Sequence, residues 1–345
     1  MNERYTPERL WRAYRHCWFV VARSCDIATP QAAQLLDQNL VVFRDAQGVA
    51  RVTDRRCAHR GADLAAGKVT ANGIQCPYHG WAFDGESGQC TEIPALCDGA
   101  TIPGNAKIRS YPTVERYEHV WTCLEEPMMD IPTPPELDGG VWEWLPAEPI
   151  PAKCGFMAAT ENFRDMAHFP FVHSISMGEV SPLVPKLDVQ REGRRLGASF
   201  RYERVEGANF SHIGDAWMHY HSYAPGFAAI LYHYDEEGKR YLVDFPTPVS
   251  RERCIIHWAV AVDRDFKGGT VEDILALETE VFNEDTPILE GLCPSEVPLA
   301  GQWPEASTAA DVYTLNYRRA TQYVVDQILD RLEAEEQSRI TATEL

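Results

Sequence analysis

The sequence predicts an α+β protein in which an all-β domain, residues 1–127, precedes an α+β domain, residues 128–345, with a central antiparallel sheet flanked by helices. Three observations support this fold class. The 345 residues are long for one domain and sufficient for two. Residues 39–121 have a β pattern that glycine and asparagine interrupt about every ten residues, as in a small barrel or sandwich. The second half has strand patterns in its middle and helical patterns on either side.

Residues that typically begin or end helices and strands predict where the elements of the two domains lie. Thr6-Pro7-Glu8 is typical of a helix start, because a hydroxyl cap precedes proline and an acidic residue, and this helix should end near Arg15. Residues 127–151 are rich in proline and acidic residues, which predicts a linker or a domain surface. The second domain should contain one helix, four strands and two further helices, at residues 158–167, 196–206, 228–234, 241–245, 254–262, 271–290 and 310–335.

Composition narrows the classes of function. The formal net charge is −19, so phosphates would be repelled over most of the surface and no nucleic-acid partner is expected. The first residues are charged, and apolar runs such as residues 18–22 and 259–262 are too short to span a bilayer. We therefore expect a cytoplasmic protein with no membrane partner, whose ten cysteines are thiols or ligands rather than disulfides.

Two of the cysteines belong to a pair of short metal-ligand motifs. Cys57 and His59 form a C-x-H motif, and after sixteen intervening residues Cys76 and His79 form a C-x-x-H motif. Nearby glycines allow the backbone to turn closely around a buried ion. One zinc ion could use this set, but zinc motifs usually pair cysteine with cysteine and histidine with histidine. The alternating order favours a two-iron cluster, in which both thiolates bind one iron and both imidazoles bind the other.

A second group of candidate ligands lies in residues 161–173. Asp165 and His168 are three positions apart, which would place them on one face of a helix. His173 could not share that face on a continuous helix, but Pro170 should end or kink the helix so that the two imidazoles converge. Two such histidines need one carboxylate to form a 2-His-1-carboxylate site for iron(II), with open positions for dioxygen.

The carboxylate is predicted to come from the helix at residues 271–290. Asp285 lies near the middle of its apolar stripe, Glu284 lies toward the edge, and Glu278 is a rival on the same face. A carboxylate that faces a core needs a partner, which can be a metal ion or an arginine. Pro287 suggests that the helix is distorted close to Asp285. The stripe consists of Ile274, Leu277, Val281, Phe282, Ile288 and Leu289.

The first pair of motifs resembles the cluster-binding loops of the Rieske family. Ala62 and Tyr78 stand where the respiratory members carry a further cysteine in each loop, so the likeness is to the oxygenases and their ferredoxins. Residues 161–173 resemble the N-x-x-D-x-x-H-x(4)-H motif of the Rieske oxygenase catalytic domain, and residues 282–290 resemble its later E-D segment. The best overall likeness is to the compact caffeine, dicamba and vanillate demethylases of this family.

The resemblance implies a role for each site residue. Asn162 and Asp165 belong to the catalytic machinery. The resemblance also implies a homotrimeric active unit, in which Asp165 would link His168 to His79 of the partner subunit as an electron bridge. The implied ligands are those of one [2Fe–2S] cluster and then those of one Fe(II) per subunit: Cys57, His59, Cys76 and His79, and His168, His173 and Asp285.

The implied activity is that of a terminal oxygenase. It would oxidise a small aromatic or heterocyclic substrate with dioxygen and with electrons from a separate ferredoxin or flavin reductase, since the chain has no dinucleotide fingerprint or phosphate loop. Hydroxylation of a methoxy or N-methyl group gives a product that loses formaldehyde, so O- or N-demethylation is the leading prediction. Ring or alkyl hydroxylation is the alternative within the class, and electron transfer without catalysis is the alternative outside it.

The walls of the substrate pocket are less well specified. Histidines and aromatic residues in or beside the middle strands are candidates, although an ordinary structural position is the more frequent outcome for such residues. The candidates are His212, His219, His221, His233, His257, Trp217, Phe227, Tyr232 and Phe245.

Overall fold

The chain folds into two compact units. The first unit, Arg15–Met129, is all β, and the second unit joins Met1–Tyr14 to Asp130–Leu345 and is α+β. The N-terminal helix therefore belongs with the second unit and not, as expected, with the first. None of the described helices is both long enough and apolar enough to cross a membrane. The computed structural model describes residues 3–71, 73–137, 140–179, 181–202, 215–297, 299 and 305–343.

The first unit is built from short antiparallel strands. They are β1 (Phe19–Arg23), β2 (Gln31–Leu35), β3 (Gln38–Arg44), β4 (Ala50–Asp54), β5 (Lys68–Val69), β6 (Gly73–Gln75), β7 (Ala82–Asp84), β8 (Cys90–Glu92), β9 (Ser110–Tyr111), β10 (Thr113–Arg116) and β11 (His119–Thr122). They form three sheets, β1-β11-β10, β2-β3-β4-β9 and β5-β6-β7-β8. Alternate residues of β3, Val41 and Phe43, fill a core that also contains Cys57 and Cys76. Both candidate thiolates are therefore held at the edge of a packed core.

The second unit is built around one large antiparallel sheet with the order β12-β19-β18-β17-β16-β15-β14, to which β13 is added beside β19. Consecutive strands from β14 to β19 pair with each other in antiparallel fashion, so the sheet is largely a meander. The strands are β12 (Trp142–Pro146), β13 (Ile150–Ala152), β14 (Gln190–Glu192), β15 (Arg195–Tyr202), β16 (Ala216–Tyr223), β17 (Phe227–Tyr234), β18 (Gly238–Ser250) and β19 (Arg253–Asp263).

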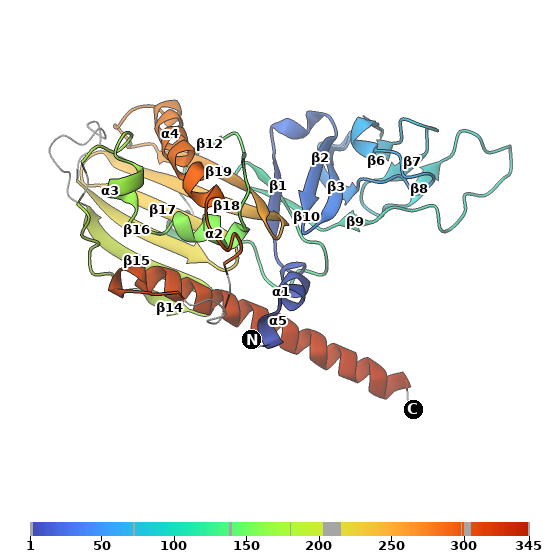
Figure 1. The fold of residues 1–345 in the computed structure, drawn as a ribbon. Helices are drawn as coiled ribbons and strands as arrows, with labels where there is room; N and C mark the ends of the chain where they lie inside the picture. The colour runs from blue at the N-terminus through green and yellow to red at the C-terminus, as the bar shows by residue number, and fades with distance from the viewer. Residues whose placement is uncertain are drawn as a thin grey trace. The chain divides into compact units, whose positions relative to one another are not determined.

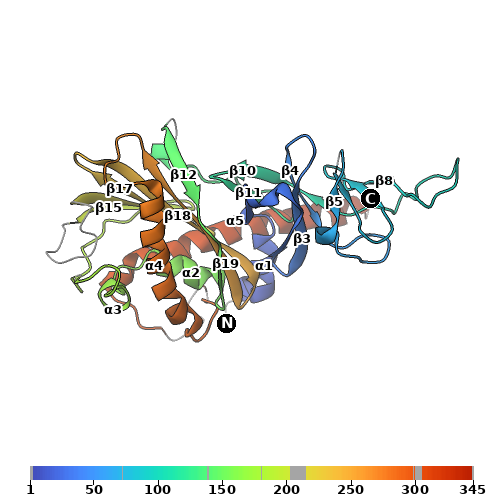
Figure 2. The same cartoon turned by 90° about the horizontal axis from the view of Figure 1, so that it is seen from above.

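The longer helices of this unit cover one face of the sheet, as Figures 1 and 2 show. The helices are α1 (Pro7–Tyr14), α2 (Phe156–Asn162), α3 (Phe169–Val172), α4 (Val271–Glu290) and α5 (Val312–Thr343). α2 packs against β18 and β19, α4 packs against β12 and β19, α5 packs against β15, and α1 packs against α5. Trp258 of β19 shows the closeness of the packing, because its ring lies 4.6 Å from that of Phe282 on α4.

Three local differences from the expected elements have physical reasons. β12 and β13 lie in the segment predicted as a linker, where Pro146 and Pro151 are tolerated because both strands pair on one side only, with β19. β16 was not predicted, because its alternation is mostly between polar and aromatic residues. The helix predicted at residues 158–167 ends at Asn162, and Pro170 lies in the first turn of α3, where proline is tolerated, instead of ending a helix.

Arg164 fixes the loop between α2 and α3. The residue is 2% exposed, its Nε donates to Ser222 Oγ at 2.6 Å, and its Nη2 donates to the Phe227 carbonyl oxygen at 3.2 Å. The guanidinium carbon lies 3.7 Å from the ring centroid of Tyr317 on α5. One side chain thus ties the loop to two strands and to a helix, directly before Asp165.

Replacement of Arg164 by alanine should lower the free energy of unfolding by about 3–5 kcal/mol, because it leaves several buried acceptors unpaired. Arg251→Ala is the matched control, since among the described residues it breaks an exposed ion pair with Glu8 and should change the free energy of unfolding little. Urea denaturation followed by tryptophan fluorescence measures both changes. Equal losses in the two variants would contradict the anchoring role of Arg164.

Candidate active site

Two loops of the first unit have the same backbone hydrogen-bond pattern around a cysteine. The carbonyl of Cys57 accepts from the amide of Gly61 at 2.9 Å, and the carbonyl of Cys76 accepts from the amide of Gly80 at 3.2 Å. Both glycines have positive φ, +68° and +72°, which residues with a Cβ rarely adopt. The loops are therefore two copies of one tight turn, each of which presents a cysteine.

The imidazoles of these loops lie next to each other. The ring centroids of His59 and His79 are 4.6 Å apart, and His59 stacks on Trp81 at 4.5 Å. Burial and the nearby thiol of Cys76 raise the pKa of the Cys57 thiol to about 11, and the buried Nδ1 of His59 has no hydrogen-bond partner among the described residues. An unpaired ring nitrogen and adjacent thiols are suitable donors for a metal group.

The spacing of the four donors favours two irons over one zinc. In the part of the chain that the structure describes, no three of the ligand atoms of these cysteines and histidines lie within 4.8 Å of one another. The four ligand atoms of one tetrahedral zinc ion would lie closer together than this, because each is about 2.0–2.3 Å from the metal. A cluster that spans two irons accommodates the wider spacing.

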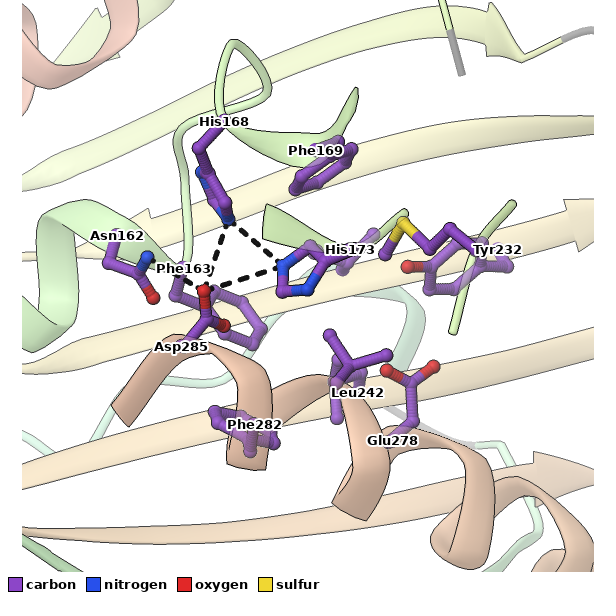
Figure 3. Close-up of a pocket in the computed structure, with 13 residues that line it drawn as sticks. Asn162, Phe163, His168, Phe169, His173, Tyr232, Leu242, Glu278, Phe282 and Asp285 are labelled. Atoms are coloured by element: carbon purple, nitrogen blue, oxygen red, sulfur yellow. Dashed lines mark hydrogen bonds and ion pairs between the residues drawn. The ribbon is translucent and has the colours of Figure 1, made fainter. Parts of the chain in front are cut away.

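The trio with close ligand atoms is His168, His173 and Asp285, which Figure 3 shows pointing toward one another. The two Nε2 atoms are 3.1 Å apart, and Asp285 Oδ1 lies 3.3 Å from His168 Nε2 and 3.4 Å from His173 Nε2. His168 is 14% exposed through its side chain and the other two are buried. Two imidazoles and one carboxylate in this arrangement match the donor set of a mononuclear iron(II) site.

The short helix α3 sets the spacing of the two histidines. His168 precedes its first turn and His173 follows its last residue, so one helical turn separates the two side chains. The amide of His173 donates to the Phe169 carbonyl at 3.0 Å, which closes that turn. Asp285 comes from α4, which begins with a capping box formed by Thr270.

Each ligand has its own hydrogen-bond partner outside the trio. The Nδ1 of His168 lies 3.1 Å from Asp165 Oδ2, and the amide of Asn162 donates to Asp285 Oδ1 at 3.1 Å. Burial alone would lower the pKa of His168, but the carboxylates of Asp165 and Asp285 raise it to about 9. The two carboxylates thus make the centre attractive to positive charge, whether a proton or a metal ion carries it.

Glu284 is a functional candidate that the helical pattern of α4 did not single out. Its Oε2 lies 2.9 Å from His173 Nδ1, and it also accepts from Ser176 Oγ at 2.6 Å. A carboxylate on the far nitrogen of a ligand imidazole fixes the orientation of the ring and increases its basicity. The signals in the sequence were its position next to Asp285 and its place in the E-D segment. The rival ligand, Glu278, instead forms a buried ion pair with Arg240.

A pocket opens beside the trio and is mostly apolar. Its apolar walls are Phe163, Phe169, Met177, Ile230, Leu242, Val281 and Phe282. Tyr232 and Glu278 add polar atoms to it, and Asn162 lines it next to Asp285. An apolar pocket with few polar groups is suited to a small organic molecule.

Strand register separates the remaining candidates from this pocket. Side chains alternate between the two faces of a sheet, and Ile230 and Leu242, which pair across β17 and β18, face the pocket. Tyr232 is the only one of the earlier pocket candidates that shares this face and lines the pocket. His212 lies outside the described residues. The others fall at the alternate positions: Trp217, His219, His221, Phe227, His233, Phe245 and His257.

Comparison with known proteins supports both halves of this description. Residues 17–112 match the model of the Rieske [2Fe-2S] domain, and residues 152–327 match that of the vanillate O-demethylase oxygenase C-terminal domain. The chain is 29% identical over 334 residues to methylxanthine N1-demethylase NdmA of Pseudomonas putida, covering 88% of this chain and 87% of the relative.

Solved structures with the same fold extend over nearly the whole chain. The structure of Pseudomonas putida NdmA with caffeine aligns with a TM-score of 0.79 at 24% identity, covering 92% of this chain and 96% of that one. Dicamba monooxygenase bound to dicamba aligns with a TM-score of 0.76 at 20% identity, covering 93% and 99%. The predicted fold class, an all-β domain followed by an α+β domain, is thereby confirmed.

Removal of the carboxylate in Glu284→Ala should weaken metal binding about 10–100-fold, because the imidazole of His173 loses the partner that orients it. The measurement is an anaerobic titration of metal-depleted protein with Fe(II) in competition with a chelator. Glu280→Ala, at an exposed position on the same helix, is the control and should bind normally. Unchanged affinity in Glu284→Ala would show that the hydrogen bond to His173 is dispensable.

Proposed function

The chain belongs to the Rieske non-heme iron oxygenases, a family of oxidoreductases, and on this basis we propose that it demethylates a small aromatic or heterocyclic substrate with dioxygen. The observation that carries the proposal is the convergence of His168, His173 and Asp285 beside an apolar pocket. The names of its relatives, an N-demethylase among them, support demethylation over ring or alkyl hydroxylation.

The proposed cofactors follow from the two donor sets. The Rieske domain indicates one [2Fe–2S] cluster, and the thiol and imidazole groups of its two loops are the proposed ligands. The proposed ligands of a mononuclear Fe(II) are His168, His173 and Asp285. When bound, this iron would supply the activation of dioxygen, with electrons that pass through the cluster.

The residues around the second centre have separate tasks in this proposal. Asp165 and Glu284 accept hydrogen bonds from the ligand imidazoles, which leaves the Nε2 atoms free for the metal. The amide of Asn162 holds the carboxylate of Asp285 in place. The apolar walls would exclude bulk water and hold a methyl group of the substrate close to the three proposed ligands of the iron. Oxidation of that methyl carbon yields formaldehyde and the demethylated product.

The electrons are proposed to come from a separate reductase. The active unit is proposed to be a homotrimer, in which Asp165 links His168 to His79 of the partner subunit. The support is that Asp165 already contacts His168 through Oδ2 and that its side chain is 35% exposed, so it can reach a second imidazole. A carboxylate between two ligand imidazoles would provide a short hydrogen-bonded path for electrons.

Oxygen uptake that depends on substrate is the direct test of the proposed function. Purified protein is supplied with a surrogate ferredoxin reductase and screened with methoxy- and N-methyl-substituted aromatic and heterocyclic compounds. Formation of formaldehyde in proportion to the oxygen consumed would support demethylation. Hydroxylated products without formaldehyde would favour ring or alkyl hydroxylation instead.

Single alanine substitutions of His168, His173 and Asp285 should each abolish turnover and leave the visible spectrum of the cluster unchanged, because the two metal groups use separate residues. Iron analysis should fall from about three to about two irons per chain. Glu280→Ala is the control and should retain iron and activity. Full activity in Asp285→Ala would exclude this carboxylate as a ligand.

Asp165→Asn keeps the size of the side chain but removes its charge and one acceptor. We expect this variant to retain the cluster and the mononuclear iron yet to lose nearly all turnover, since electrons no longer cross between subunits. The decisive measurement is single-turnover transfer from a pre-reduced cluster, together with the mass of the active species by light scattering. Activity in a monomer, or transfer at the wild-type rate in Asp165→Asn, would overturn the assignment.

A further inference from the structure

The pocket beside the metal centre has one wall with a second buried carboxylate. Glu278 is 3% exposed and lines the same pocket as the trio, about two turns before Asp285 on α4. Figure 3 shows its carboxylate directed from α4 toward the pocket, on the side where Tyr232 lies. No part of the reaction proposed above uses this group.

The positive partner of Glu278 is not part of the pocket lining. Arg240 of β18 is buried, donates from Nη1 to Glu278 Oε1, and does not line the pocket. Its guanidinium carbon lies 3.7 Å from the ring centroid of Tyr232, and its Nε donates to the hydroxyl of Tyr234 at 3.0 Å. The guanidinium is therefore held by protein groups, and only the carboxylate is presented to a molecule in the pocket.

One oxygen of this carboxylate remains available. The Oε2 of Glu278 accepts no hydrogen bond from the residues that the structure describes, while Oε1 is occupied by Arg240. In an apolar pocket an unpaired carboxylate oxygen favours a ligand that donates an N–H or O–H group, because an unsatisfied buried acceptor is costly. The same oxygen disfavours an anionic ligand, because the carboxylate faces the pocket whereas the guanidinium that balances its charge does not line it.

We propose that Glu278 selects the substrate class: uncharged aromatic or heterocyclic molecules that donate an N–H or O–H to its Oε2, in preference to carboxylates and sulfonates. This inference rests on the proposed function, because it concerns the substrate of the same pocket. Arg240 is the positioning residue for this carboxylate, and the ring of Tyr232, which lines the pocket, contacts the guanidinium.

The test compares the binding of three probes of similar shape to the metal-loaded protein by calorimetry. They are 4-methoxybenzamide, which donates N–H groups, methyl 4-methoxybenzoate, which is neutral without a donor, and 4-methoxybenzoate, which is anionic. The amide should bind at least about tenfold more tightly than the carboxylate, and more tightly than the ester. Equal or tighter binding of the carboxylate, or no binding of the amide, would overturn the proposal.

Glu278→Gln separates selection from a purely structural role of the ion pair. The amide oxygen can still accept from Arg240, but the negative charge is gone. The preference for the benzamide over the benzoate should fall to less than about threefold, whereas Glu280→Gln should keep the wild-type ratio. A wild-type ratio in a folded Glu278→Gln protein would overturn the proposal. If this variant does not fold, the order of binding affinities of the three probes for the wild-type protein decides whether the proposal stands.

Oxygen uptake with the same probes is measured separately. Oxygen uptake tests the proposed function alone, because calorimetry measures the binding preference without any turnover. Probes that bind in the predicted order but cause no oxygen uptake would count against the oxygenase reaction on these compounds and leave the selection by Glu278 standing.

Discussion

The catalytic unit depends on how two buried carboxylates of one helix are paired with positive charge. Glu278 is paired with the guanidinium of Arg240, whereas the ion-pair partners of Asp285 among the described residues are the imidazoles of His168 and His173. An isolated charge in a low-dielectric interior is strongly unfavourable. The Asp285 site must therefore take up positive charge from outside the side chains, as a proton or as a metal ion. The same helix supplies one carboxylate to the protein's own ion pairs and another to the metal centre.

The ligand geometry is held by parts of the chain that are distant in sequence. Asn162 ends α2, Glu284 belongs to α4, and Asp165 lies in the loop that Arg164 anchors to the sheet. Each of them contacts a different ligand, so no ligand is held by its own backbone alone. This arrangement keeps the three ligand atoms close together before any metal is bound, which limits the reorganisation that binding requires.

Sequence periodicity predicted the features of the site that depend on neighbouring residues of one element. The helical period of α4 was sufficient to favour Asp285 over Glu284 as a ligand, but it could not separate Asp285 from Glu278, because that distinction depends on an arginine on another strand. The break after Asn162 was missed for the same reason: tertiary contacts of Arg164 stabilise a loop where the sequence favours a longer helix. The histidines of the middle strands could not be assigned to a face until the register was known.

The placement of α1 has a consequence for how the chain is made. Residues near the N-terminus pair with α5, as in the contacts of Arg4 with Asp326 and of Arg9 with Glu333, so the second unit is closed by segments from both ends of the sequence. During synthesis the all-β unit is complete while most of the second unit is still untranslated. The all-β unit can therefore fold first. The oxygenase unit can reach its final contacts only after α5 has left the ribosome. The contacts between α1 and α5 therefore form late in the folding of this unit.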